Sequence, residues 1–444
     1  MYNFQEGLYA DVRIEDVFET KIAYKDQKLE QQKIRSYKGA FIRVFDGLKW
    51  YYGATTETNN IQEELDALYK MATPHEDIQN HPIVQKFEVH NEEQLLFTKN
   101  SVSEIPVEKK KTLMTSYFPI FDVPEVIQSN FMYVDKKVIK SFYSSKGSNL
   151  VFDSQTAGIR VGCDFLIGEE KGRESFAKAF TTFEPLKNLE DFYKEELTKQ
   201  IHYVTYAENV ESGEYTVVLS PMATGVFTHE SFGHKSESDF MVGDETMAKE
   251  WALGKKVAAE GVTIIDDGNE QGSGFVQYDD EGTKAQKTMI ITDGALTGRL
   301  HSASTATALN EKLTSNARAM NFEFEPIVRM TTTYIEKGTR KKDDIISEIR
   351  NGIYVETIRH GSGMTTFTIA PNRAYKIENG KITKPLKVSV VTGNVFSTLD
   401  EIDAISEEFE LLSFVGGGCG KMEQYPLPVG FGGPFIRVKK LNVQ

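Results

Sequence analysis

The stretch Tyr215-Thr-Val-Val-Leu-Ser-Pro-Met-Ala-Thr-Gly-Val-Phe-Thr-His-Glu-Ser-Phe-Gly-His-Lys235 carries the strongest structural signals in the sequence. Its first part, residues 215–220, is rich in apolar and β-branched residues and predicts a buried strand. Ser220 and Pro221 predict the start of a helix, because serine caps helix N-termini and proline is tolerated at the first helical position. A buried strand that leads into a helix therefore positions the histidines that follow.

This helix carries His229, Glu230 and His234, a combination typical of zinc hydrolases. In the common H-E-x-x-H motif the two histidines are about four residues apart and share one helix face. Here they are five positions apart, which at roughly 100° per residue separates them by about 140° on a regular helix. A single π-helical turn would return them to one face, and Gly233 suits such a distorted turn. We therefore predict that the helix is distorted between Glu230 and His234.

A catalytic zinc site needs a third protein ligand and an open position for water. The candidates are Cys419, His301, Glu237 and Asp239. We favour Cys419, because it lies among four glycines that permit close backbone approach and because a thiolate is a good zinc donor. His301 is interpreted as a histidine on the surface or as one that supports a metal ligand without binding the metal. Asp239 either orients a ligand histidine or lies on the surface, and the second interpretation is favoured.

Glu230 directly follows the first histidine and suits the role of general base, with its carboxylate directed at the open coordination position. The alternative is a solvated helix glutamate. Cys163 lies within an apolar strand and is interpreted as a core residue. The residues thus predict Zn²⁺ bound by His229, His234 and Cys419, with Glu230 as the catalytic group.

Two segments of the N-terminal half, residues 36–54 and 154–172, share a short turn, the tripeptide Ile-Arg-Val and a second strand. This similarity predicts a degenerate internal duplication. The alternative is a chance similarity between two unrelated β-hairpins, and it has equal weight because any two hairpins look alike over so few residues.

The predicted fold class is α+β, with both strands and helices in the N-terminal part and a mostly β pattern from residue 262 onward. The N-terminal domain, residues 1–205, would consist of duplicated strand and helix units. The C-terminal domain, residues 206–444, would be β-rich and would carry the metal-site helix. Short helices are predicted at 122–128 and 399–405.

The composition is typical of a soluble globular protein, with 40% hydrophobic and 26% charged residues. A net charge of −14 argues against broad binding to nucleic acid or to anionic membranes. Two cysteines are too few for a disulfide framework, no apolar run reaches the length of a membrane span, and the N-terminus lacks signal-peptide features. We therefore expect a cytoplasmic protein with neither a nucleic-acid nor a membrane partner.

The sequence resembles the TldD/PmbA family of metallopeptidases, and more closely its TldD-like, metal-bearing branch. The resemblance rests on the histidine motif with Glu237 and Asp239 after it, and on Gly417–Lys421. Further matches are Ala10–Arg13, Gly39–Val44, Asp280–Gly282 with Gln286, Arg329–Tyr334, Gly352–Tyr354, Ile377–Ile382, Thr392–Gly393 and Pro428–Gly430.

The resemblance implies a zinc-dependent peptidase that hydrolyses unfolded or unstructured peptides inside an enclosed dimer. His229, His234 and Cys419 match the family's metal ligands, and Glu230 matches its general base. The chain would form a homodimer, or a heterodimer with a PmbA-like sister subunit that lacks the metal motif.

Two alternative functions remain open at this point. The first is a non-catalytic or regulatory partner protein with a structural metal, since the family has been linked by name to modulation of DNA gyrase. The second is a zinc amidase with a non-peptide substrate. For a peptide substrate we expect extended binding along a strand edge, because strands dominate the C-terminal half.

Overall fold

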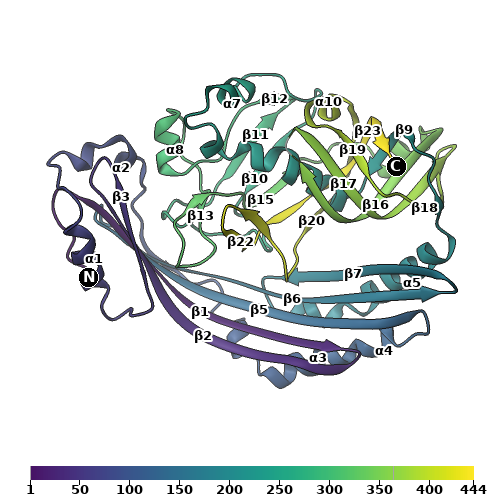
Figure 1. Cartoon of the computed structure of the whole chain (residues 1–444), viewed down its shortest axis with the longest axis horizontal. Coiled ribbons are helices and arrows are strands. Elements are labelled where there is room, and N and C mark those ends of the chain that lie inside the picture. Colours follow the sequence, from purple (N-terminus) through teal and green to yellow (C-terminus); the bar gives the residue numbers. More distant parts are fainter. Residues whose placement is uncertain (1, 364) are drawn as a thin grey trace.

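A computed structural model describes residues 2–363 and 365–444 of the chain. It contains a long curved sheet formed by the N-terminal part and a second large sheet inside a C-terminal body that lies above the concave side of the first (Figure 1). Most strand pairs in both sheets are antiparallel. The predicted α+β class is confirmed.

The N-terminal sheet contains the same order of elements twice, three antiparallel strands followed by a helix. The first unit is β1 (Tyr9–Lys25), β2 (Lys28–Phe45), β3 (Trp50–Thr55) and α1 (Ile61–Tyr69); the second is β5 (Val126–Ser144), β6 (Asn149–Ile167), β7 (Glu170–Phe180) and α5 (Glu190–Tyr206). The strand order β3-β2-β1-β5-β6-β7 places the two first strands side by side at the centre. Both Ile-Arg-Val segments lie in the middle strand of a unit. An origin by duplication stays a prediction.

The segment between α1 and β5 consists of short helices and one short strand. It comprises η1 (Ile78–Asn80), α2 (Pro82–Lys86), β4 (Asn91–Gln94), η2 (Val102–Glu104), α3 (Val107–Ser116) and α4 (Phe118–Phe121), and η3 (Glu184–Asn188) precedes α5. The helix predicted at 122–128 is wrong, because β5 already begins at Val126. Val126 pairs with Phe165 of β6, and cross-strand pairing outweighs the helix-start signal of Pro124.

Helices α3 and α4 cover the convex face of the N-terminal sheet (Figure 1), and α5 packs against α4, β6 and β7. Even-numbered residues of β1, such as Ile22 and Tyr24, point to that face and join a core with Phe131 and Tyr193. Odd-numbered residues of β1 point to the opposite, concave face, because side chains alternate along a strand. The concave face is therefore the one turned toward the C-terminal body.

The C-terminal sheet has the strand order β12-β11-β10-β15-β23-β9-β16-β17-β18-β8, with β19 and β20 paired to its central strands. Its strands are β8 (Glu208–Asn209), β9 (Gly213–Leu219), β10 (Ile264–Asp267), β11 (Lys287–Thr292), β12 (Ala295–Leu296), β15 (Thr332–Ile335), β16 (Asn351–Gly363), β17 (Thr366–Glu378), β18 (Lys381–Lys387), β19 (Val391–Asn394), β20 (Ile402–Leu412) and β23 (Gly430–Val443).

Two small hairpins and several short helices complete this body. The hairpins are β13 (Ala317–Arg318) with β14 (Ile327–Val328), and β21 (Cys419–Lys421) with β22 (Gln424–Leu427). The helices are α6 (Pro221–Thr228), η4 (His229–Gly233), η5 (His234–Ser236), η6 (Ser238–Phe240), α7 (Glu245–Glu250), α8 (Ala303–Ala308), α9 (Lys342–Ser347) and α10 (Val395–Asp400).

The helix predicted at 399–405 is displaced in the structure. Helix α10 begins earlier, because the side chain of Asn394 caps it by accepting hydrogen bonds from the amides of Phe396 and Ser397. Ile402 and Ala404 lie in β20 instead, where they are buried and pair with β23. The prediction is wrong for residues 402–405, since strand pairing there depends on distant residues.

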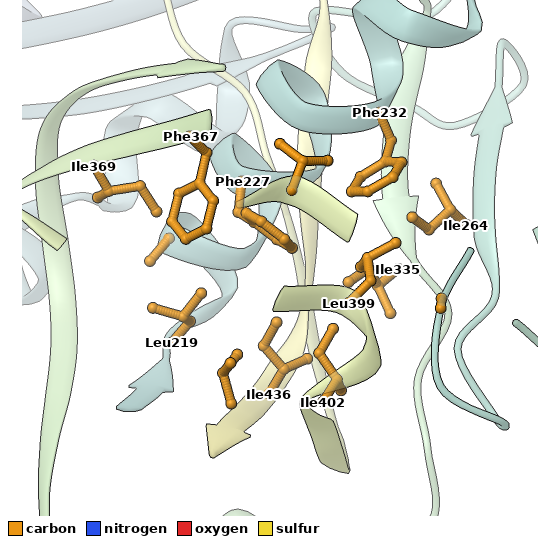
Figure 2. Close-up of a cluster of buried hydrophobic side chains, with 14 of the residues drawn as sticks. Leu219, Phe227, Phe232, Ile264, Ile335, Phe367, Ile369, Leu399, Ile402 and Ile436 are labelled. Carbon is orange, nitrogen blue, oxygen red and sulfur yellow. The ribbon is translucent and has the colours of Figure 1, made fainter. Parts of the chain in front are cut away.

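Helix α6 packs over the C-terminal sheet and anchors the histidine motif to it (Figure 2). The ring of Phe227 lies edge-on to Phe367 at 4.8 Å, and Phe232 extends the same core. At Gly225 a Cβ atom would be 2.5 Å from the backbone nitrogen of Gly432, so only glycine permits this approach to β23. The position of the helix is therefore set by core packing on both sides of the motif.

No helix in residues 2–363 and 365–444 is long and apolar enough to cross a membrane. The boundary predicted between residues 205 and 206 falls at the C-terminal end of α5. The division into two domains stays a prediction.

Candidate metal centre

The helix that carries the histidines is distorted where the sequence predicts it. Ser220 caps α6 by accepting a hydrogen bond from the amide of Ala223 at 3.2 Å, and α6 ends at Thr228. The next five residues, His229–Gly233, form the π-helical turn η4. A π turn contains more residues than an α turn, so it brings positions five apart toward one side. The imidazole centroids of His229 and His234 are 5.1 Å apart.

Gly233 is required by packing within this turn. A Cβ atom at Gly233 would lie 1.9 Å from the sulfur of Met330, which no side chain can tolerate without rearrangement. Met330 is itself wholly buried in the core of the C-terminal body. The wide turn therefore lies directly against the core, and this contact helps to hold His234 in place.

Cys419 reaches the two histidines from the β21–β22 hairpin. Its sulfur is 3.4 Å from Nε2 of His234, and the possible ligand atoms of His229, His234 and Cys419 all lie within 4.8 Å of one another. The predicted approach of the glycine-rich turn to the distorted helix is thus confirmed. At Gly418 a Cβ atom would be 2.4 Å from the carbonyl oxygen of Leu427, so the hairpin can close only with glycine at this position.

A buried carboxylate holds the second nitrogen of His234. Nδ1 of His234 is 3.1 Å from Oε2 of Glu237, whose side chain is completely buried. Glu237 also pairs with Nζ of Lys421 at 3.1 Å, and Lys421 in turn pairs with Asp239 at 2.7 Å. With Nδ1 engaged by Glu237, His234 presents Nε2 to Cys419. This carboxylate–histidine arrangement is typical of metal sites, where it orients the ring and increases its basicity.

The charges at the site favour the metal-binding form of the cysteine. Burial raises the pKa of the Cys419 thiol, but hydrogen bonds and positive charge from His229 and His234 outweigh burial and lower this pKa to about 5. Burial lowers the pKa of His234, but Cys419 and Glu237 raise it to about 10. Cys419 is therefore a thiolate at neutral pH, and the thiolate is the form that binds metal.

Glu230 lies in the wall of the same pocket as the three possible ligands. The pocket has a volume of about 210 Å³ and is lined by Val226, His229, Glu230, His234, Phe414, Gly418, Cys419, Gly420, Val429 and Phe431. Burial is the main cause that raises the pKa of Glu230, whereas His229 and His234 lower it. A partly desolvated carboxylate beside an accessible pocket suits proton transfer.

The side chains fit a zinc ion. Nδ1 of His229 is buried and has no hydrogen-bond partner in the described part of the chain, an arrangement that is costly in a metal-free core. Two imidazoles and one thiolate form a donor set that Zn²⁺ prefers. In residues 2–363 and 365–444, no fourth histidine, cysteine or carboxylate joins the group. The three candidate ligands would hold the ion, and the pocket beside them leaves room for a water molecule.

Comparison with known proteins identifies the family. Residues 212–444 match the model of the PmbA/TldA metallopeptidase C-terminal domain, and residues 10–72 match PmbA/TldA metallopeptidase domain 1. A metalloprotease of Methanothermobacter thermautotrophicus is 31% identical, over 98% of this chain and 95% of its own. The chain belongs to the TldD/PmbA family of metallopeptidases.

Other TldD/PmbA relatives extend the similarity along the whole chain. A protein of Saccharolobus solfataricus described as a zinc metalloprotease TldD homolog is 27% identical, over 98% of this chain and 96% of its own. The crystal structure of TldE from Thermococcus kodakarensis superposes with a TM-score of 0.76 at 17% identity, over 98% of this chain and 96% of that one. The superposition on TldE shows that the two proteins share one fold.

The structure changes the interpretation of three side chains in this TldD/PmbA member. His301 is buried, not on the surface, and it contacts Glu311 at 3.0 Å, away from the metal pocket. Glu237, a candidate third ligand in the sequence, occupies the orienting position behind His234 instead. Asp239 contacts Lys421 and not a histidine.

The role of Lys421 could not be recognised in the sequence. Its side chain is buried and joins Glu237 to Asp239, and Nζ also donates to the carbonyl oxygen of Val328 at 2.9 Å. The only available signal was its position two residues after Cys419 in the glycine-rich turn. Cys163 is confirmed as a core residue of β6, where burial raises its pKa to about 12.

Proposed function

We propose that this TldD/PmbA member is a zinc-dependent peptidase in which His229, His234 and Cys419 bind Zn²⁺ and Glu230 is the general base. The observation that carries the proposal is the convergence of three ligand atoms within 4.8 Å of one another at a pocket that also contains Glu230. The relatives described as metalloproteases support the same reaction class.

A catalytic metal is favoured over a structural one. Structural zinc sites have about four protein ligands and no open position. Here three candidates converge within the described residues, and the remaining side of the group borders a pocket. A regulatory protein with a purely structural metal would not need an accessible carboxylate such as Glu230 beside it.

The residues of the chain have distinct roles in the proposed reaction. A bound zinc ion supplies Lewis acidity to a water molecule and to the substrate carbonyl. Glu230 accepts a proton from the attacking water and then transfers it to the leaving amine. Glu237 keeps the ring of His234 in the orientation that presents Nε2 toward the pocket.

The substrates we propose are unfolded or unstructured peptides that bind in extended form. Strand β21 pairs only with β22 among the described strands, and Cys419 and Gly420 border the pocket. The carbonyl oxygen of Cys419 already accepts a hydrogen bond from Arg329 at 2.8 Å, so a peptide would pair with the strand edge at Gly420. An extended peptide can add to such an edge by main-chain hydrogen bonds. We further propose a homodimer, or a heterodimer with a PmbA-like sister subunit, which the structural likeness to TldE supports.

Digestion of an unbiased peptide mixture tests the reaction class. We expect the zinc-loaded protein to cleave internal amide bonds of unstructured peptides, and to spare the same sequences inside a folded protein that cannot enter the pocket. Products are identified by mass spectrometry, with a chelator-treated sample as the control. Hydrolysis of simple amides without any peptide products would contradict the peptidase function and indicate a zinc amidase.

Replacement of Glu237 by glutamine tests the carboxylate behind His234. Glu237→Gln keeps the shape of the side chain but removes its charge, and loss of such an orienting partner lowers metal affinity by roughly 10- to 100-fold. Zinc affinity is measured by competition with a chromophoric chelator. Glu311→Gln is the matched control, because Glu311 contacts the buried His301 away from the pocket. Equal zinc affinities in the two variants would contradict the assigned role.

A further inference from the structure

Two lysines lie directly opposite each other on the concave face of the N-terminal sheet. The register of β1 and β2 pairs Lys21 with Lys33, and both side chains are exposed. Like charges in directly opposed positions of neighbouring strands destabilise the sheet. Neither lysine forms an ion pair or a side-chain hydrogen bond in the described part of the chain. The pair therefore has a cost that its neighbours do not offset.

The adjacent row of the same face adds two more cations. Glu19 of β1 is opposite Arg35 of β2 on one side and Lys136 of β5 on the other. Arg35 forms an ion pair with Glu19, whereas Lys136 has no ion-pair partner in the described residues. Burial is the main cause that lowers the pKa of Lys136. Of the carboxylates on this face, Glu19 pairs with Arg35, and Glu15 lies near Lys136 but is already paired with Arg13 and Lys140.

The carboxylate next to Lys136 in the sequence does not neutralise these cations. Asp135 neighbours Lys136 in sequence, but its carboxylate points to the convex face of the sheet, because side chains alternate along β5. There it pairs with Nζ of Lys110 at 2.5 Å and accepts a hydrogen bond from Tyr133 at 2.6 Å. The part of the concave face formed by Lys21, Lys33, Arg35 and Lys136 therefore keeps an excess of positive charge in a chain whose net charge is −14.

These cations line a cavity that adjoins the metal pocket. The cavity has a volume of about 500 Å³, and Lys21, Lys33, Arg35 and Lys136 form its floor, while its roof includes the loop 414–417 and Pro426. Gly416 lies so close to the sheet that a Cβ atom there would be 2.3 Å from the terminal methyl of Met132. Phe414 lines both this cavity and the metal pocket.

We propose that this cationic cavity binds an acidic segment of the peptide substrate, next to the bond that is cleaved at the metal pocket. The inference rests on the proposed peptidase function and specifies its substrate class. A protein with a net charge of −14 repels acidic peptides at long range, so their capture requires a local region of opposite sign. Met132, Val134 and Pro428 line the same cavity, which gives it apolar surface for the side chains between the acidic ones.

A set of three fluorescent peptides of equal length tests the proposal. The peptides share one sequence in which a run of positions is Glu, Gln or Lys. Binding is measured by anisotropy on zinc-loaded Glu230→Gln, which does not depend on turnover, and kcat/KM is measured on the unaltered protein. We expect the Glu peptide to bind roughly tenfold more tightly than the Lys peptide at low salt, with the difference shrinking as salt screens the charges.

The double variant Lys21→Gln/Lys33→Gln should lose most of this preference. The matched control is Lys25→Gln/Lys28→Gln, a second pair of directly opposed lysines that flanks the β1–β2 turn and does not line the cavity. It should keep the preference. The same anisotropy measurement with a single-stranded oligonucleotide distinguishes peptides from nucleic acid.

The outcomes separate this inference from the proposed function. Selective binding of the Glu peptide without any cleavage would contradict the peptidase function but support the acidic-segment site. Cleavage of all three peptides at equal efficiency, unchanged by Lys21→Gln/Lys33→Gln, would overturn the inference alone. Equally tight binding of the oligonucleotide, or a change of oligomeric state in the double variant with peptide binding intact, would also overturn it.

Discussion

Glu230→Gln should retain its zinc and lose peptide hydrolysis. The amide has nearly the shape of the carboxylate but cannot accept a proton from water, and general acid–base groups contribute about 10²- to 10⁴-fold to rates. We therefore expect kcat to fall by at least ~100-fold. Because Glu230 is not among the three converging ligand candidates, zinc content should stay at one ion per chain. Kinetics on a quenched fluorescent peptide and elemental analysis of the same sample measure the two quantities.

Glu245→Gln is a suitable control for the loss of one negative charge near the site. Glu245 lies in the first turn of α7 and is exposed, so its replacement should leave both zinc content and kcat unchanged. Peptide cleavage by Glu230→Gln at the rate of the unaltered protein would exclude Glu230 as the base. Loss of zinc in Glu230→Gln would instead indicate that Glu230 is a metal ligand.

Cys419→Ser should lose zinc and, with it, peptide hydrolysis. The hydroxyl group does not ionise near neutral pH, whereas the neighbouring histidines lower the pKa of the Cys419 thiol to about 5 and so maintain a thiolate donor. Removal of a ligand should reduce zinc affinity by more than the roughly 10- to 100-fold that follows loss of an orienting partner. Chelator competition measures this affinity.

X-ray absorption at the zinc edge provides a readout that is independent of activity. The unaltered protein should show one sulfur neighbour at about 2.3 Å from zinc, together with nitrogen neighbours. Cys163→Ala is the matched control, because Cys163 is buried in β6 within a separate core. The sulfur signal should persist in Cys163→Ala and vanish in Cys419→Ser. Persistence of the signal in Cys419→Ser would remove Cys419 from the site.

Part of the candidate site could be predicted because its signals are local. The five-residue spacing of His229 and His234 is incompatible with one face of a regular helix, and Gly233 permits the wider turn that the structure contains. Ser220 and Pro221 mark the helix start, and this signal is also local, because a cap satisfies backbone amide groups within the first turn. These properties depend on neighbouring residues and are therefore visible in the sequence.

Other parts of the site depend on contacts between distant residues. The sequence shows Glu237 as an acidic residue near the motif. Only the folded chain shows that it forms a hydrogen bond with His234 and an ion pair with Lys421, and that it therefore lies behind the ligands. The burial of His301 is likewise decided by the elements around it. No local pattern distinguishes a ligand from an orienting carboxylate three residues after a histidine.

The sequence by itself determined the helix start at Ser220, the distorted turn with its two histidines, and the α+β class. The sequence also indicated Cys419 as the third ligand, but only the tertiary structure brings its sulfur to His234 across 185 residues of chain. The tertiary structure alone decided that Glu237 lies behind His234 and that Lys21 lies opposite Lys33 on the concave face of the sheet. The physical reason is the range of the forces involved. Capping and backbone sterics act within a turn or two, whereas strand register and core packing are properties of the whole folded chain.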